Sequence, residues 1–176
     1  MNQWMYHLSR STGIVAMLLV VAALLWGFLF SSRATGRRLR PNWWLDLHNW
    51  LGGLALVFTG LHLVTAWLDS NSGIGLVQIV VPQTAAIDAA AITWGVLATY
   101  TMAAAVFTTW PRRWSNRRWW RVVHVTTVAG TGLVFLHAYQ SGSDASKVWF
   151  QTLLVACAGV ATYGLGLRLS TLRRTD

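Results

Sequence analysis

Long apolar stretches separated by short polar segments dominate the pattern of this chain. Five stretches are long enough to cross the hydrocarbon core of a bilayer, which takes about 20 residues as a helix. They cover roughly residues 13–30, 43–68, 89–110, 119–139 and 148–169. Because backbone amides in lipid must be satisfied within their own segment, each stretch is expected to be an α-helix. The sequence therefore predicts an all-α integral membrane protein, a five-helix transmembrane bundle folded as one domain over residues 1–176.

Composition supports a membrane location. The chain is 55% hydrophobic and 11% charged, whereas soluble domains carry about 25% charged residues. Its net charge of +9 is compatible with nucleic acid as a partner, but the basic residues mark topology instead, because cytoplasmic loops carry an excess of Lys and Arg. Only Arg10 and Lys147 lie on the opposite side. The basic side is formed by Arg33, Arg37, Arg38, Arg40, Arg112, Arg113, Arg117, Arg118, Arg121, Arg168, Arg173 and Arg174.

This charge pattern places the N-terminus outside and the C-terminus in the cytoplasm of a bacterial cell (inner) membrane, with lipid around the bundle. The first stretch is expected to be retained, since positive charge follows it and "SSRATGRRLR" offers no clear cleavage pattern. Residues 74–83 are too short to span, and are expected to lie along the outer interface or to cover an outer cofactor. Cys157, the only cysteine, excludes an internal disulfide and suits apolar packing.

Tryptophans are expected to anchor the bundle at both membrane interfaces. The inner group is Trp43, Trp44, Trp110, Trp114, Trp119 and Trp120, and the outer group is Trp4, Trp67 and Trp149.

Four histidines lie within two of the predicted spans. His48 and His62 are fourteen residues apart, and His124 and His137 are thirteen apart, which is about 20 Å along a helix in each case. Both spans enter from the inner side, so His48 and His124 share the inner level, whereas His62 and His137 share the outer one. Ionisable groups inside a membrane are costly and usually functional.

One imidazole from each helix at each level could grip a planar macrocycle, and haem iron accepts such axial ligands. Two stacked haems would give electrons a path between the faces. Two glycine groups could admit a bulky cofactor or let helices approach each other. They are Gly52, Gly53 and Gly60 in the second span and Gly130 and Gly132 in the fourth. The thirteen-residue spacing requires either a distorted fourth span or cofactors off the helix axis.

The four histidines are also compatible with a bare metal or transport site and with structural hydrogen bonding. A structural zinc site needs four ligands, and each level supplies two. Asp46 points away from His48, and a transporter would be expected to carry an acidic residue in mid-span. The sequence disfavours both alternatives but leaves them open.

The histidine spacing resembles the transmembrane domain of ferric reductases and NADPH oxidases, and "RSTGIVAM", "NSGIGLVQIVVPQTA" and "HAYQSGSDA" resemble small bacterial proteins of that kind. The segment "WWRVVHVTTVAGTGLVFLHAY" is also similar to the haem subunit of a periplasmic methionine sulfoxide reductase. The resemblance implies two non-covalent b-type haems, the inner one bound by His48 and His124 and the outer one by His62 and His137.

Function follows from this resemblance as an expectation. The chain would relay electrons from a cytoplasmic donor to an extracytoplasmic acceptor (a ferric species, oxygen, quinone or a protein), as a ferric reductase-like oxidoreductase subunit. The chain carries no G-x-G-x-x-G motif, and no FAD or NAD(P) domain is expected within it. A separate flavoprotein reductase or a membrane quinol is therefore the expected donor. The alternatives are a haem-binding anchor feeding one periplasmic oxidoreductase and a small metal-binding or transport bundle.

Several polar residues are candidates for supporting roles. Arg121, three residues before His124, could pair with a haem propionate or simply anchor the helix. Asp144 could attract a ferric species and Lys147 could meet a propionate, although a solvated loop is the simpler expectation for both. His7 is expected at the interface. An acidic donor protein could dock on Arg112, Arg113, Arg117 and Arg118.

Overall fold

The computed structural model describes residues 3–32, 41–70, 72–109, 117–141 and 144–173. These contain the helices α1 (Gln3–Ser31), α2 (Pro41–Leu68), α3 (Leu76–Val80), α4 (Ala89–Thr109), α5 (Arg117–Ser141) and α6 (Val148–Leu172). All except α3 are long and apolar enough to cross a membrane. The predicted all-helical architecture with five long helices is thus confirmed for the described residues. The largest difference in bounds is at α1, which begins ten residues before the predicted span.

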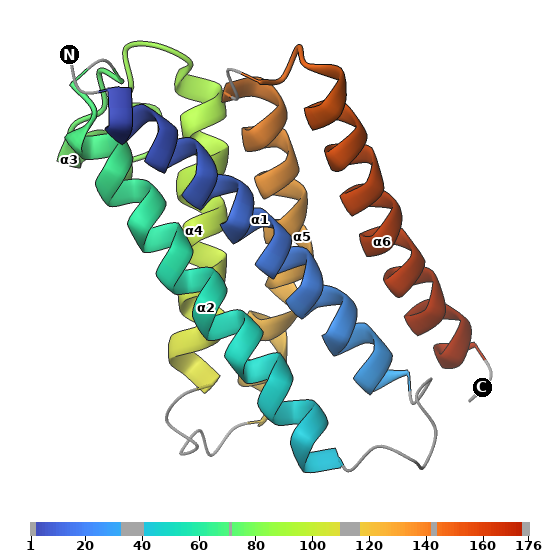
Figure 1. The fold of residues 1–176 in the computed structure, drawn as a ribbon. Coiled ribbons are helices and arrows are strands. Elements are labelled where there is room, and N and C mark those ends of the chain that lie inside the picture. The colour runs from blue at the N-terminus through green and yellow to red at the C-terminus, as the bar shows by residue number, and fades with distance from the viewer. Residues whose placement is uncertain (1–2, 33–40, 71, 110–116, 142–143, 174–176) are drawn as a thin grey trace.

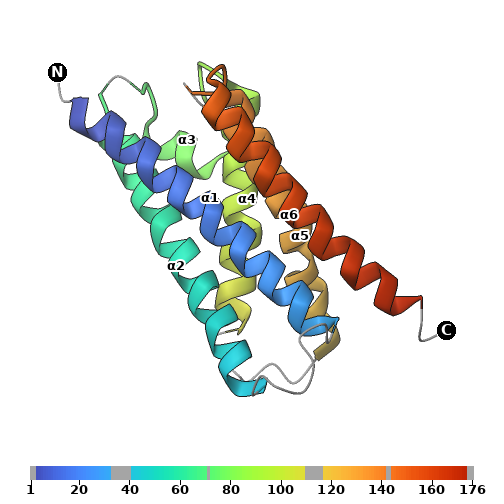
Figure 2. The same cartoon turned by 45° about the vertical axis from the view of Figure 1, so that its right-hand side comes forward.

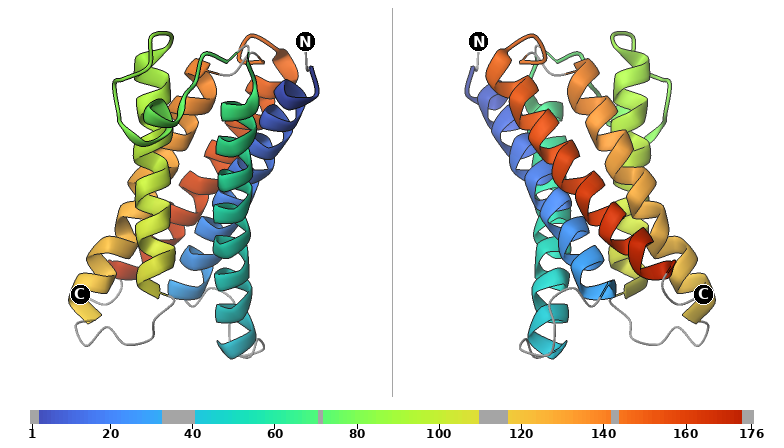
Figure 3. Two further views of the ribbon diagram at one scale, coloured as in Figure 1. Left: turned by 90° about the vertical axis from the view of Figure 1, so that its left-hand side faces the viewer. Right: turned by 90° about the vertical axis from the view of Figure 1, so that its right-hand side faces the viewer.

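The long helices alternate in direction, so the chain ends lie at opposite ends of the bundle (Figure 1). We call the end where α1 begins the upper end and the end where α6 finishes the lower end. Two antiparallel pairs, α1 with α2 and α4 with α5, make the most extensive contacts, and α6 packs mainly on α1. The views from the sides show α6 on the outside of the bundle (Figures 2 and 3).

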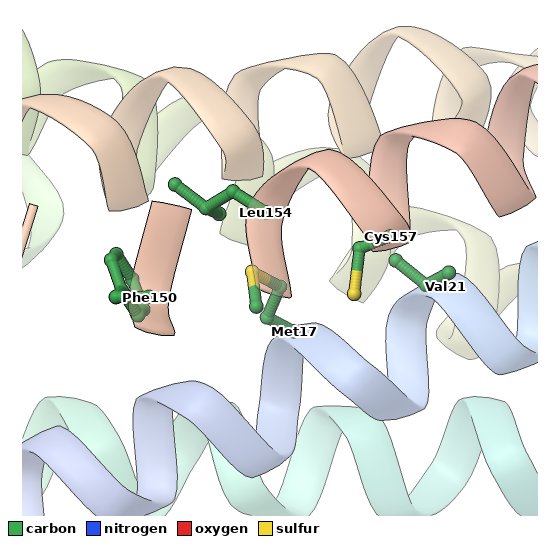
Figure 4. Close-up of a cluster of buried hydrophobic side chains, with 5 residues drawn as sticks. All are labelled: Met17, Val21, Phe150, Leu154 and Cys157. Atoms are coloured by element: carbon green, nitrogen blue, oxygen red, sulfur yellow. The ribbon is translucent and has the colours of Figure 1, made fainter. Parts of the chain in front are cut away.

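Two small apolar clusters hold these helices together. Met17 and Val21 of α1 pack on Phe150, Leu154 and Cys157 of α6 (Figure 4). Cys157 is therefore a packing residue, as expected.

A second cluster joins three helices at mid-height. Val20 of α1, Ala55 of α2 and Met102 of α4 are buried together. Ala55 lies midway between His48 and His62 along α2, so this cluster separates the two histidine levels.

The outward surface of the bundle is strongly apolar. Val57, Val125 and Val155, on three different helices, are 57%, 59% and 72% exposed. Apolar exposure on this scale is unfavourable in water and fits helices surrounded by lipid, as in a multi-pass membrane protein.

The connection from α2 to α4 folds back over the upper end. It contains α3, and two contacts tie it to α4: the Gln83 N–H donates to the Thr93 hydroxyl at 2.9 Å, and the Tyr100 hydroxyl donates to the Val80 carbonyl. Consequently α3 is held beside the upper part of the bundle.

The predicted tryptophan belts are only partly seen. Trp4, Trp43 and Trp149 are exposed, as an interface position requires. Trp44 is not: it is 4% exposed and stacks on Trp26 with 4.1 Å between ring centroids. Its expected anchoring role is wrong, because it joins α1 to α2 in the bundle interior.

Candidate cofactor site: two facing histidine pairs

The structure brings the four span histidines together in the predicted combinations. The rings of His62 and His137 lie next to each other near the upper end, with 6.1 Å between centroids and 73° between ring planes. The rings of His48 and His124 lie next to each other near the lower end, with 5.7 Å between centroids and 63° between ring planes. We call these the upper pair and the lower pair. In both, one ring comes from α2 and the other from α5.

These separations can be compared with what a shared metal ion requires. Imidazole nitrogens bind transition metals at about 2 Å, and the ring centre lies about 1 Å farther away, so two rings on opposite sides of one ion have centres about 6 Å apart. Both measured separations agree with this value. The residues present therefore fit bis-imidazole ligation of one iron centre at each level.

Hydrogen bonds to the backbone orient three of the four rings. Nδ1 of His62 bonds the Ser9 carbonyl at 2.8 Å, Nδ1 of His48 bonds the Ala23 carbonyl at 3.0 Å, and Nδ1 of His137 bonds the Ala91 carbonyl at 2.8 Å. Since a carbonyl only accepts, Nδ1 is the donor and Nε2 keeps its lone pair. Metal-binding histidines are commonly oriented in this way.

A glycine accompanies each of these carbonyls one helical turn later. A methyl group at Gly95 would lie 2.8 Å from Nδ1 of His137, one at Gly13 would lie 3.0 Å from Nδ1 of His62, and one at Gly27 would lie 3.2 Å from Cε1 of His48. A contact of 2.8 Å is shorter than real side chains make, so Gly95 must be a glycine for the ring to lie this close, whereas a methyl group at Gly13 or Gly27 would require the ring to shift by a few tenths of an ångström.

The three sites therefore share one local design: a carbonyl at position i and a glycine at i+4 hold a ring from the adjacent antiparallel helix. On α1 the two copies, Ser9 with Gly13 and Ala23 with Gly27, are fourteen residues apart. The histidines of α2 have the same spacing, so the antiparallel α1/α2 pair repeats the contact at both levels.

His124 is the exception. Its Nδ1 is buried and has no hydrogen-bond partner among the described residues, and its ring stacks on Trp120 of its own helix at 5.0 Å. Thirteen residues beyond Ala91 and Gly95, the spacing between the α5 histidines, α4 carries Ala104 and Thr108. A branched side chain thus stands at the position that corresponds to Gly95, and we attribute the missing contact to this difference.

The thirteen-residue spacing needs no break in α5. The helix is continuous from Arg117 to Ser141, so it is not interrupted at Gly130 or Gly132. The two histidines of α5 have different surroundings: His137 bonds the Ala91 carbonyl of α4, and His124 stacks on Trp120 of its own helix.

The glycines singled out in the sequence differ in their surroundings, and only Gly130 matches the alternative of close helix approach. A methyl group at Gly52, Gly53, Gly60 or Gly132 would touch nothing within 4 Å, and one at Gly130 would collide with Thr101 of α4. Gly130 is thus a helix-packing position. The glycines that sequence reasoning missed are Gly13, Gly27 and Gly95. The signal for the first two is their fourteen-residue spacing, which equals the spacing of His48 and His62.

The upper pair faces a cavity of about 450 Å³, within the size range of cofactor pockets. Ile14, Val96 and Met102 contribute to its mainly apolar wall, and Gln78 and Ile79 of the α3 region line it as well. Residues 74–83 therefore lie against this cavity, in agreement with the expectation that they cover the outer site.

An ion pair that the sequence did not predict lies beside this cavity. The guanidinium of Arg10 donates to the carboxylate of Asp144, whose side chain is 10% exposed. The expectation of a solvated loop at Asp144 is wrong, because the residue is buried against α1. Lys147, by contrast, is exposed. Sequence reasoning missed Arg10, whose signal was a lone cation inside an otherwise apolar helix.

The remaining candidates are less constrained. Arg121 is exposed on α5, and its pairing with a propionate stays a prediction. His7 is exposed, and its ring centroid lies 5.4 Å from that of Tyr6. Arg112 and Arg113, with the side chain of Arg117, lie outside the described residues, so docking of an acidic donor stays a prediction too. Also outside are Trp110, Trp114, Arg33, Arg37, Arg38, Arg40 and Arg174.

The bare-metal alternative finds little support in this geometry. Among the described residues, no three His, Cys, Asp or Glu side chains come together as a metal-binding group. A structural zinc ion takes four such ligands, and each pair provides two.

We compared the chain with known protein families, curated proteins and solved structures. No protein-family model, curated protein or solved structure matches the chain.

Proposed function

We propose that this chain is a multi-pass membrane cytochrome that binds two b-type haems and relays single electrons across the bilayer. One observation carries the proposal: two histidine pairs lie one above the other along the bundle, with 5.7 and 6.1 Å between the ring centroids of each pair. Three of the four rings are held through Nδ1. His48 and His124 would ligate one haem, and His62 and His137 the other.

Each part of the chain has a definite task in this proposal. Haem supplies the one-electron chemistry when bound. His48, His62 and His137 would present Nε2 lone pairs to the iron, because backbone carbonyls hold these rings through Nδ1, and His124 would be the fourth ligand. The apolar cluster around Ala55 keeps water out of the space between the two levels. No proton-transferring side chain is required.

The charge distribution gives the proposed direction of electron flow. In the described residues, Arg118, Arg121 and Arg168 lie toward the lower end, while Arg10 and Lys147 lie toward the upper one. By the positive-inside rule the lower end faces the cytoplasm. A bacterial inner membrane, a flavoprotein or quinol donor at the lower haem and a ferric reductase-like acceptor step at the upper haem complete the proposal.

A visible spectrum of the purified protein tests the proposal directly. We expect a Soret band, sharp alpha and beta bands after reduction, and about two haems per chain by pyridine haemochrome assay. A protein that stays colourless after expression with ample haem, or that takes up zinc in its place, would rule the cytochrome out.

Two single substitutions test the ligand assignment. His62→Ala should remove the upper haem and leave the lower one reducible from the cytoplasmic side, because the levels are about 20 Å apart along α2. His48→Ala should remove the lower haem and leave the upper one bound. Retention of both haems in either variant would contradict the assignment.

A further inference from the structure

We infer that Arg10 binds an acidic group of the cofactor in the upper cavity, namely a haem propionate. This inference rests on the proposed function. It starts from Nε of Arg10, which is buried without any hydrogen-bond partner in the described part of the chain. A buried N–H left unpaired costs about 1–3 kcal/mol, so an acceptor from a bound ligand is expected there.

The position of Arg10 suits this role. Arg10 follows Ser9, whose carbonyl holds His62, and both residues line the upper cavity together with His62 and His137. A ligand held between the two imidazoles would therefore lie within reach of the guanidinium. Iron porphyrin carries two carboxylates, which are its only charged groups at the rim of the ring.

Asp144 pairs with Arg10 but occupies only part of its hydrogen-bonding capacity. Its carboxylate accepts from Nη2 of Arg10, and the Arg10 guanidinium carbon lies 5.2 Å from the centroid of the Tyr6 ring. These contacts fix the guanidinium plane. Arginine has five N–H donors, and Nε–H is not used by Asp144, so it is available to a second carboxylate.

The same contacts lie close to the groups that hold both upper imidazoles. Ser9 and Arg10 belong to α1, which holds His62. Ser141, whose hydroxyl lies 3.2 Å from Nδ1 of His137, stands three residues before Asp144. The Arg10–Asp144 pair thus closes the polar side of the cavity beside both imidazoles.

Haemin and haemin dimethyl ester distinguish a propionate contact from a purely structural ion pair. Both have the same iron and ring, and only the first carries carboxylates. We propose to measure their dissociation constants for the upper site by spectral titration of haem-depleted protein in nanodiscs. A His48→Ala background removes the lower ligand pair, so that only the upper site is loaded.

The informative comparison is between Asp144→Asn and the double variant Arg10→Gln with Asp144→Asn. They differ only in Arg10, and neither leaves Asp144 as a buried unpaired carboxylate. We expect the ester to bind about tenfold or more weakly than haemin in the parent protein and in Asp144→Asn, the size of a charge-assisted hydrogen bond. In the double variant the two compounds should bind within about threefold of each other.

Arg168→Gln is the matched control. Arg168 donates to the Ser31 carbonyl at the lower end, 3.0 Å away, and its substitution should leave the ester penalty unchanged. An ester penalty of the same size in the double variant, or none in the parent protein, would overturn the inference. Failure of every protein to bind haemin would instead refute the proposed function.

A folding defect is also covered. If the double variant takes up no haemin, Arg10→Lys replaces it in the comparison. Lysine keeps the charge but lacks the Nε–H edge, so the ester penalty should fall below that of the parent. An undiminished penalty would overturn the inference.

Discussion

Substitution of Gly95 by alanine tests whether the glycine beside each ring is needed for cofactor binding. The new methyl group would lie 2.8, 3.0 and 3.2 Å from Nδ1, Cε1 and Cγ of His137. Carbon contacts are favourable only at about 3.5–4.0 Å, so the ring must move by about 0.7 Å. Such a shift breaks the 2.8 Å bond from Nδ1 to the Ala91 carbonyl, because that distance would exceed the usual limit of about 3.2 Å.

The size of the effect follows from comparable metal sites. Losing a partner that orients a metal-bound histidine typically lowers metal affinity about 10–100-fold, which corresponds to about 1.4–2.7 kcal/mol. Alanine also stabilises a helix relative to glycine by about 1 kcal/mol. Gly95→Ala should therefore weaken the upper haem without destabilising the haem-free bundle.

The assay is the rate of haem loss to excess apomyoglobin, followed in the Soret region. Gly95→Ala and Gly13→Ala should accelerate loss of the upper haem only. Gly27→Ala should act on the lower haem, and more mildly, because its closest contact is 3.2 Å. Gly132→Ala is the matched control, since its methyl group would meet nothing within 4 Å.

The expected effects have a definite order, with Gly95 first, Gly13 next, Gly27 third and Gly132 without effect. Unchanged haem loss in both Gly95→Ala and Gly13→Ala would refute the role given to these glycines. Equal acceleration in Gly132→Ala would show that any added methyl group disturbs the bundle.

Three further outcomes concern the lower pair and the topology. Trp120→Ala should weaken the lower haem about three- to tenfold, because an aromatic stack is worth about 0.5–1.5 kcal/mol; in a haem-loss assay the exposed Trp119→Ala should behave as the parent. Thr108→Gly should slow loss of the lower haem by opening space beside His124, and faster loss would contradict the proposed cause of its missing hydrogen bond. Green fluorescent protein fused after Asp176 should remain in the cytoplasm and fluoresce. The same reporter fused before Met1 should be exported and should not fluoresce, and the reverse result would invert the proposed orientation.

The level of each histidine could be predicted from the sequence, but its support could not. Helical rise alone sets His48 and His62 about 21 Å apart, and the levels of the two histidine spans match because both spans run in the same direction. Which backbone carbonyl each ring meets depends on the register between helices, and the apolar sequence of α1 constrains that register weakly. For this reason Ser9, Ala23 and Ala91 gave no signal beforehand.

Periodicity likewise failed where burial depends on a partner. Trp44 and Asp144 read as an interface anchor and a loop residue, because tryptophan and aspartate commonly occupy such places. Trp44 is buried against Trp26 of the preceding helix, and Asp144 is buried beside Arg10, 134 residues earlier in the chain. The sequence around Trp44 or Asp144 does not indicate these contacts with other helices.

The sequence by itself determined the helical class, the number of long helices and the depth of the four histidines, because these depend on hydrophobic length and on a fixed rise per residue. Only the tertiary structure decided that the rings of each pair lie about 6 Å apart, that three are held by a carbonyl and a glycine, and that Arg10 and Asp144 meet beside the upper pair. Such features depend on helix register and crossing, which arise from packing between segments and not from the pattern within any one of them.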